Sequence, residues 1–217
     1  MTNARQNILG AIRAALGPRD TTAETIAAQA AALVADPDRV RPDFGGVDLI
    51  SRFIAKATSE RVTATIARVD SFAGVPAAVL DYVGEAGLPA QAAVQPTDRL
   101  RGLDWAGLEL ADTPGTDGGL AVTLADYGVA ETGSVVFHSG PDAPVLLNFL
   151  PLHHLVVLET NRILAYPEDV WPRLGGVGAP QSRLLTLVTG TSGTADIEAK
   201  NVRGAHGPRH MRIILVG

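Results

Sequence analysis

The segment LISRFIAKATSERVTATI, residues 49–66, contains the change from helix to strand from which the fold can be worked out. Its apolar residues first recur at helical spacing, at Ile50, Phe53, Ile54 and Ala57, and then alternate, at Val62, Ala64 and Ile66. A period near 3.6 residues predicts a helix, and a period of two predicts a strand. The segment therefore predicts a helix over 49–57 that is followed by a strand over 62–66.

The same alternation continues toward the C-terminus. Helical spacing returns over 75–82, where Gly84 and Gly87 are expected to stop the helix, and residues 92–94 form a short apolar run. Helices that alternate with strands at this distance indicate a parallel sheet covered by helices. We therefore predict an α/β protein with an open, mostly parallel sheet in a three-layer α/β/α arrangement.

The second half of the chain is richer in strand and turn signals. Residues 120–124 and 134–138 are apolar runs and are predicted to be adjacent strands. Residues 155–158 are wholly apolar, which is typical of a strand buried on both faces, and residues 184–188 are predicted as another buried strand. A last strand is expected over 211–216. Of His153 and His154, one is expected to face solvent and the other the core.

The N-terminal part has helical rather than mixed periodicity. Residues 4–16 carry an apolar stripe, and Thr21 with Glu24 has the spacing of a capping box for a second helix. The helices could pack on a partner subunit or on the chain's own core. We predict an N-terminal helical segment over 1–44 and an α/β domain over 45–217.

Composition excludes several classes of protein. The chain has 217 residues, a formal net charge of −5 and no cysteine. The negative charge argues against nucleic acid as a partner, because such proteins need a basic face. The lack of cysteine excludes iron–sulfur ligation and a cysteine nucleophile within this chain. With neither a secretory leader nor a membrane span in the sequence, a cytoplasmic location is expected.

The segment VTGTSGTADIE, residues 188–198, is the first that could bind a ligand. A strand is predicted to run into a glycine-rich loop and then into a short helix, whose free N–H groups would favour an anion. In the alternative, the loop is a plain turn with Thr194 as the helix N-cap. The predicted anion-binding residues here are Gly190, Thr191, Ser192, Gly193, Thr194, Asp196 and Glu198. Arg203, further along, either supports the anion or is solvated.

The turn Glu131-Thr132-Gly133-Ser134 is the second such segment and is expected to face the first. A carboxylate between two buried strands is costly unless it is paired or hydrogen-bonded. Glu131 is therefore either structural or catalytic, as a base or a nucleophile. Thr132, Gly133 and Ser134 are candidate ligand contacts.

Histidines supply the remaining candidates. His206, in the turn GAHGP at 204–208, either transfers protons or binds an anion, or it is a structural turn residue. His138 and His210 are interpreted as structural. No His, Asp or Glu pair has the helical spacing of metal ligands, so no metal site is predicted. The Gly-x-Ser-x-Gly and Gly-x-Gly-x-x-Gly patterns are absent from the sequence.

Three segments together carry a resemblance: AETGSVV at 130–136, GTSGTADIE at 190–198 and GAHGP at 204–208. With PLHHLVVLE at 151–159 between the first two, they are similar to the LUD-domain proteins of the lactate utilisation protein C type. The resemblance implies a fold like the NagB/RpiA/CoA-transferase group. It also implies a role in oxidising L-lactate to pyruvate, beside partner subunits that carry the iron–sulfur clusters, with no cofactor in this chain.

The resemblance leaves the role of the chain open. As a subunit of the lactate-oxidising system, the protein would bind a small carboxylate or assemble the redox partners. A stand-alone acyl- or CoA-transferase-like enzyme is the alternative, because Glu131-Thr132-Gly133 looks similar to the Glu-Asn-Gly turn of CoA-transferases, with Thr in place of Asn. A non-catalytic regulatory or scaffold protein is the third possibility.

Overall fold

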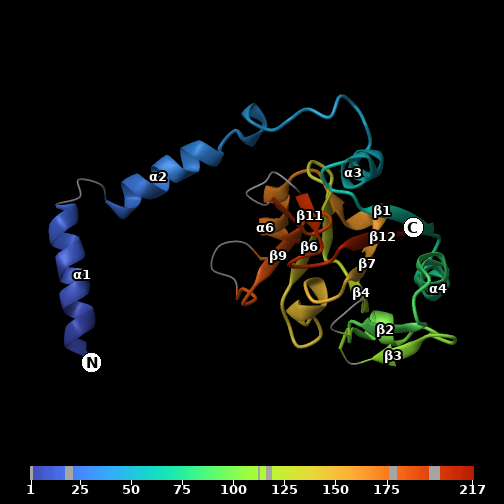
Figure 1. Cartoon of the computed structure of the whole chain (residues 1–217). Helices are drawn as coiled ribbons and strands as arrows, with labels where there is room; N and C mark the ends of the chain where they lie inside the picture. Colours follow the sequence, from blue (N-terminus) through green and yellow to red (C-terminus); the bar gives the residue numbers. More distant parts are fainter. Residues whose placement is uncertain (1, 18–21, 112, 116–118, 176–179, 196–200) are drawn as a thin grey trace. The chain divides into compact units, whose positions relative to one another are not determined.

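The structure is a computed structural model, and it describes residues 2–17, 22–111, 113–115, 119–175, 180–195 and 201–217 (Figure 1). The chain divides into two compact units, Met1–Asp43 and Phe44–Gly217. In the described part of the chain, no helix combines the length and the apolar character that crossing a membrane requires.

The first unit contains the two predicted N-terminal helices, α1 (Thr2–Leu16) and α2 (Ala23–Val34). Helix α2 is capped by Thr22, whose side-chain oxygen accepts a hydrogen bond of 3.2 Å from the N–H of Thr25. The predicted cap, Thr21, lies outside the described residues. Helix α2 ends at Val34, shortly before Asp36-Pro37, because proline cannot continue a helix.

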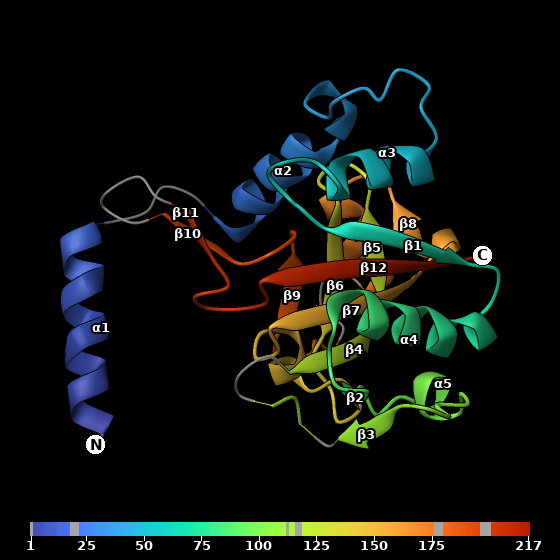
Figure 2. The same ribbon diagram turned by 45° about the vertical axis from the view of Figure 1, so that its right-hand side comes forward.

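The second unit is built on a six-stranded sheet with the order β1-β12-β7-β4-β2-β3 (Figure 2). All neighbouring pairs in this main sheet are parallel. The α/β class and the mostly parallel central sheet are therefore confirmed. Its strands are β1 (Thr65–Val69), β2 (Gln91–Val94), β3 (Glu109–Ala111), β4 (Leu120–Leu124), β7 (His153–Glu159) and β12 (His210–Val216).

Helices α4 (Val75–Ala86) and α5 (Asp98–Arg101) cover one face of the main sheet. Val79 of α4 and Leu100 of α5 pack there with Leu155 and other residues of the strands. Gly84 lies inside α4, so the prediction that it stops the helix was wrong. Gly87 ends the helix, because its φ of 63° is a conformation that glycine adopts without strain.

Helix α3 (Leu49–Ala57) and a second sheet cover the opposite face. Phe53 of α3, Val135 of the second sheet and Leu158 of the main sheet are fully buried in one cluster. The order of the second sheet is β8-β5-β6-β9. Its strands are β5 (Tyr127–Val129), β6 (Ser134–His138), β8 (Ile163–Leu164) and β9 (Leu185–Val188).

The two sheets correct the prediction that 120–124 and 134–138 are adjacent strands. The chain leaves the main sheet at Ala125, whose N–H donates to Val157, and enters the second sheet at Asp126, whose N–H donates to Val136. Strand β4 pairs instead with β7, and β6 pairs with β9. The strand predicted to be buried at 184–188 is a sheet-edge strand, and Leu187 is 39% exposed.

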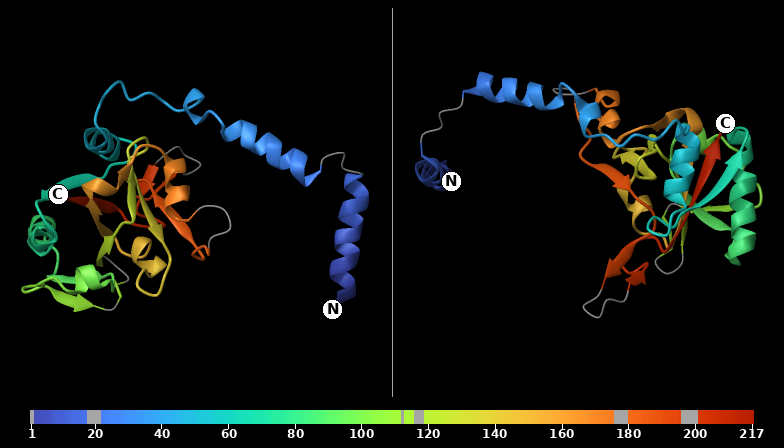
Figure 3. Two further views of the ribbon diagram at one scale, coloured as in Figure 1. Left: turned by 180° about the vertical axis from the view of Figure 1, so that it is seen from behind. Right: turned by 90° about the horizontal axis from the view of Figure 1, so that it is seen from above.

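A small hairpin follows β9, where a helix was predicted. It pairs β10 (Gly193–Ala195) with β11 (Asn201–Arg203) in antiparallel fashion and extends from the body of the unit (Figure 3). The predicted helix start at Thr194 was therefore wrong, since Thr194 pairs with Val202. The expected short helix after Pro167 is present as a 3₁₀ turn and α6 (Val170–Arg173).

Strand β7 lies inside the main sheet, and this position explains its amino-acid composition. Its neighbours are β12 and β4, and its side chains alternate between the two covered faces, so its central residues 155–158 are all apolar. Both of its histidines are buried, with exposures of 8% for His153 and 0% for His154. The expectation that one of them faces solvent was wrong. The predicted strand at 62–66 begins later, at Thr65.

Candidate functional site

Two neighbouring strands of the main sheet, β2 and β4, send the chain to opposite faces. After β2 the chain continues into α5 on the α4 face, and after β4 it continues into β5 and β6 on the α3 face. In open α/β sheets, ligands bind outside the carboxyl ends of the strands where such connections diverge. A cleft of about 330 Å³ lies at this point, and we call it the switch-point cleft. Its polar lining includes Gln95, Arg99, Asp126, His138, Glu159 and Arg162.

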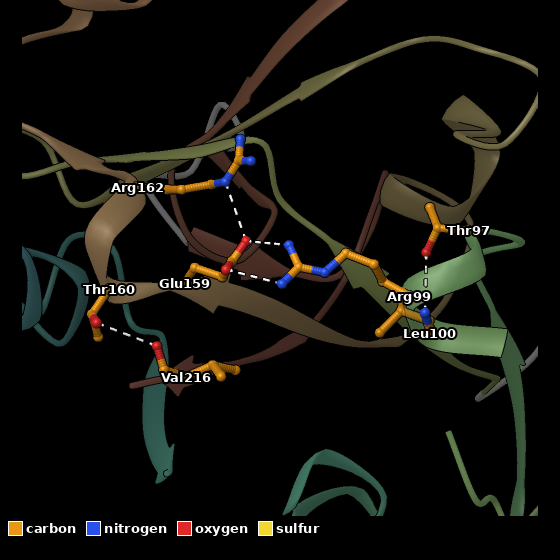
Figure 4. A network of polar contacts seen from close by, with 7 residues as sticks. All are labelled: Thr97, Arg99, Leu100, Glu159, Thr160, Arg162 and Val216. Atoms are coloured by element: carbon orange, nitrogen blue, oxygen red, sulfur yellow. Dashed lines mark hydrogen bonds and ion pairs between the residues drawn. The ribbon is translucent and has the colours of Figure 1, made fainter. Parts of the chain in front are cut away.

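Glu159, the last residue of β7, holds two arginines at the cleft (Figure 4). Arg99 donates from both terminal nitrogens to its two oxygens, at 2.5 and 3.0 Å, and the Nε of Arg162 donates to Oε1 at 3.2 Å. The hydrogen bond from Arg99 is the main reason why the pKa of Glu159 lies below its usual value. The carboxylate is therefore ionised at neutral pH, and the three side chains together carry one positive charge.

Arg162 keeps donors available for a ligand. Its two terminal nitrogens make no hydrogen bond to the other residues drawn in Figure 4, and the side chain is 45% exposed. Arg99 is more constrained, because it is bidentate to Glu159 and stacks over Phe72 at 4.1 Å. A guanidinium fork with free terminal nitrogens matches the geometry of a carboxylate. Arg162 thus has donors left to bind an anion in this cleft, whose lining also includes the acidic residues Asp98 and Asp142.

His138, the last residue of β6, pairs with Asp126 at the same cleft. Asp126 Oδ2 accepts two hydrogen bonds, of 2.7 Å from Nδ1 of His138 and of 2.8 Å from its backbone N–H. Since a carboxylate can only accept, Nδ1 carries a proton and Nε2 is the nitrogen left to face a ligand. A histidine oriented in this way is the arrangement of a general base.

Gln95 fixes the separation of β2 and β4 at the base of the cleft. Its backbone N–H donates to Val122 at 2.9 Å, and its side-chain Oε1 accepts from the N–H of Leu124 at 2.7 Å. The side chain thereby continues the pairing of the two strands after their backbones diverge. Among the described residues, no group of three or more His, Asp or Glu side chains is arranged to hold a metal ion.

The predicted turn at 131–134 packs against α3 rather than lining this cleft. Gly133 has a φ of 73°, and a Cβ there would lie 2.5 Å from the backbone nitrogen of Ala57. The hydroxyls of Thr132, Ser134 and Thr189 form a chain with two contacts of 2.7 Å. Glu131 is partly buried, and its backbone N–H donates to Ala165.

The predicted loop at 190–194 lies next to that turn, but at the amino ends of the main strands. Gly190 has a φ of 81°, and a Cβ there would lie 1.8 Å from the carbonyl oxygen of Val62. The N–H of Thr191 donates to that same carbonyl, and the N–H of Ser192 donates to Pro208. These two N–H groups are therefore satisfied within the chain and do not form a cradle for an anion.

The remaining predicted residues are dispersed. Thr191 lines a second cleft, of about 660 Å³, at the amino ends of β1, β12 and β7, which we call the amino-edge cleft. His206 is exposed and lines neither cleft. Gly193 and Thr194 belong to β10, and Asp196 and Glu198 lie outside the described residues. Catalytic roles for Glu131 and His206 stay predictions.

Comparison with known proteins places the chain in a family. It is 32% identical to lactate utilization protein C of Deinococcus radiodurans over 160 residues, which are 68% of this chain and 71% of that protein. A family model of the LUD domain matches residues 117–216. The chain belongs to the LUD domain family. This confirms the resemblance seen in the three sequence segments.

A second relative and a solved structure also match the chain. Lactate utilization protein C of Halalkalibacterium halodurans is 31% identical over 45% of this chain and 44% of its own length. A crystal structure of a DUF162 family protein from Deinococcus radiodurans has the same fold, with a TM-score of 0.56 and 18% identity. It covers 78% of this chain and 96% of that protein.

The polar residues of the switch-point cleft were missed in the sequence, although a signal for them exists. Asp126 follows the buried strand β4 almost at once, and Glu159 ends the buried strand β7. Charged residues at the carboxyl ends of buried parallel strands are candidates for a site in an open α/β sheet. His138 was interpreted as structural, and the sequence does not show its partner, because Asp126 lies twelve residues earlier, between β4 and β5.

Proposed function

We propose that this protein takes part in lactate utilisation and binds a small 2-hydroxy carboxylate, such as L-lactate, in the switch-point cleft. The observation that carries the proposal is the pairing of an oriented histidine, His138, with a guanidinium fork, Arg162, in one cleft at the switch point of the sheet. The names of the relatives from Deinococcus radiodurans and Halalkalibacterium halodurans support the lactate role.

The two groups match the two functional groups of a 2-hydroxy acid. The terminal nitrogens of Arg162 would bind the carboxylate in a bidentate manner. Nε2 of His138 would accept the hydrogen bond of the hydroxyl and, during oxidation, its proton, while Asp126 stabilises the charged ring. Arg99 and Glu159 position Arg162 through the ion pairs already described.

The electrons must leave through another protein. Oxidation of lactate to pyruvate releases an electron pair and two protons, and a chain without cysteine cannot ligate an iron–sulfur cluster through thiolates. We therefore place the iron–sulfur clusters in partner subunits that receive the electrons. His138 accepts the proton of the hydroxyl, and the C2–H bond breaks with its electron pair and its proton passing to the partner subunits. An acyl-transfer role for Glu131 gains no support from its position, since it lines neither cleft.

Calorimetric titration with L-lactate tests this assignment. Arg162→Met and His138→Asn should each raise the dissociation constant by about tenfold or more. Arg101→Met is the matched control, because Arg101 is exposed on α5 and lines neither cleft. Equal affinity in the wild type and both cleft variants would refute the site.

Growth on L-lactate as the sole carbon source tests the role. A strain that lacks the gene should grow when complemented with the wild-type chain or with Arg101→Met, and it should fail with His138→Asn. Unimpaired growth of the uncomplemented deletion strain would contradict the lactate role itself.

A further inference from the structure

The amino-edge cleft lies at the opposite end of the main sheet from the proposed lactate site and has a different charge. Three arginines line it, Arg203, Arg209 and Arg212, against one acidic residue, Glu85. This excess of positive charge occurs in a chain whose net charge is −5. A local concentration of arginine in an acidic protein is typical of a site that attracts an anion.

Arg203 is held in this cleft by neutral groups. Its Nη1 donates to the hydroxyl of Thr63 at 2.6 Å and to that of Thr191 at 2.8 Å. The two hydroxyls also contact each other at 2.6 Å. Because these partners carry no charge, they orient the guanidinium without neutralising it. The charge stays available to a ligand.

Thr63 adopts a strained backbone conformation at this point. Its φ of 62° is the only positive φ among the non-glycine residues that the structure describes. A branched residue in the left-handed region costs on the order of 1–2 kcal/mol. Such strain persists where the surroundings require it, and it is concentrated at functional sites. Here it brings the hydroxyl of Thr63 onto Thr191 and Arg203.

The other two arginines differ from each other. Arg212 forms an ion pair of 2.7 Å with Glu85 and lies over the ring of Tyr82. Arg209 has no acidic partner among the residues that the structure describes. After the pair of Arg212 and Glu85 is set aside, Arg203 and Arg209 leave two positive charges. That number matches a dianion better than a monoanion such as lactate.

Two stacked histidines form the wall beside these arginines. The rings of His153 and His210 are 4.6 Å apart and nearly parallel, and Nδ1 of His153 is 2.7 Å from the hydroxyl of Tyr82. Burial first and the neighbouring Arg209 second lower the pKa of His210. Neutral at pH 7, His210 offers a hydrogen bond and an exposed flat face rather than a further charge.

We propose that the amino-edge cleft binds a small phosphate-bearing molecule, with Arg203 and Arg209 on the phosphate. A phosphate group carries nearly two negative charges and several strong acceptor oxygens, which suits two guanidinium groups. The cleft, at about 660 Å³, is within the size range of pockets for cofactor-sized ligands. This site is separate from the lactate site and does not depend on it.

Titration calorimetry with inorganic pyrophosphate tests the proposal on the full chain. The wild type should bind pyrophosphate, and Arg209→Met should weaken binding by about tenfold or more, since it removes one of two free charges. Glu85→Gln should tighten binding about threefold, because it removes the single acidic residue of the cleft. Arg101→Met, outside both clefts, should leave the affinity unchanged.

The opposite responses of Arg209→Met and Glu85→Gln separate a specific site from general attraction to positive charge. Absence of pyrophosphate binding by the folded wild type would overturn the proposal. Equal losses in Arg209→Met and Arg101→Met would overturn it too, because binding would then not depend on the cleft. His138→Asn should bind pyrophosphate normally, so failure of the lactate site is distinguishable from failure of this one.

Discussion

The two ends of the main sheet use charge in opposite ways. At the carboxyl ends of the strands, two acidic residues of the switch-point cleft are hydrogen-bonded to basic residues. Glu159 is paired with Arg99, and Asp126 is paired with His138. At the amino ends, Arg203 is oriented by hydroxyls and its charge is left unbalanced. The first arrangement suits proton transfer on a small ligand, and the second suits electrostatic binding of an anion.

Close backbone packing at two glycines is a second feature of the region near the amino ends. Gly133 and Gly190, in the segments that carry the family resemblance, each lie against another stretch of backbone. They join α3, the start of β1 and the loop after β9 into one packed junction near the amino ends. Packing thus explains Gly133 and Gly190 in these segments. The ligand binding that we propose at the carboxyl ends depends instead on single charged residues.

The largest expected effect concerns that junction. Gly190→Ala should lower the free energy of unfolding by more than about 4 kcal/mol, because its Cβ would lie 1.8 Å from the Val62 carbonyl oxygen. Urea denaturation measures the change. Gly84→Ala is the control, since a Cβ there meets nothing within 4 Å, and it should stabilise α4 by roughly 0.5–1 kcal/mol. A tolerated alanine at 190 would disprove the close approach.

The second effect concerns the core between the two ends. Complete burial lowers the pKa of His154 from 6.5 to about 3, so the folded protein holds the ring neutral while the unfolded chain protonates it below pH 6.5. The unfolded state then binds more protons, and stability falls as pH falls. Between pH 7 and pH 4 this residue should account for a loss of roughly 3 kcal/mol.

His154→Gln keeps a polar group near Thr123 and removes the titration. Its unfolding free energy should decline less steeply between pH 7 and pH 4 than that of the wild type. Parallel pH profiles for the two proteins would show that His154 is not the buried neutral ring described above.

The third effect compares one carboxylate from each cleft. Glu159→Gln should cost about 1–2 kcal/mol of stability, because it removes an ionised acceptor shared by two arginines. Glu85→Gln should leave stability almost unchanged, since the Glu85 side chain is 59% exposed and solvent screens its ion pair. Chemical denaturation of both variants measures the two changes in stability. A larger loss of stability for Glu85→Gln than for Glu159→Gln would contradict the assignment of the stronger ion pairs to the switch-point cleft.

The smallest effect tests the strain at Thr63. Ordinarily valine is better tolerated than glycine next to a strand. Here Thr63→Gly should be more stable than Thr63→Val by about 1 kcal/mol, because glycine accepts a φ of 62° and valine does not. Thermal unfolding ranks the two variants, and the ordinary order would show that the backbone at 63 is relaxed.

Periodicity was sufficient to predict most of the main sheet and its helices. The apolar stripe at 50–57 predicted helix α3, and the apolar run at 155–158 predicted strand β7, because the spacing of apolar residues shows which side chains are buried. The second sheet could not be predicted from local spacing. The chain changes sheets through hydrogen bonds from Ala125 to Val157 and from Asp126 to Val136, and only the tertiary arrangement brings these groups together. The hairpin at 193–203 was mistaken for a helix, because glycine and threonine suit either turn.

The candidate site was harder to predict for a related reason. Gly133 and Gly190 were predicted as ligand contacts, and in the structure the group that lies against each of them is the chain's own backbone. The residues of the switch-point cleft come from α5, β6 and the ends of β4 and β7, which no linear motif contains. Only the placement of these elements brings His138, Asp126 and Arg162 together.

Imidazole ¹H–¹⁵N spectra recorded during a titration with L-lactate test the central claim most directly. The chain has five histidines, with His138 at the switch-point cleft and His153 and His210 at the amino-edge cleft. We expect the His138 signals to shift with saturation while those of His153 and His210 stay in place. Movement of His153 and His210 without His138 would contradict the assignment of lactate to the carboxyl ends of the strands.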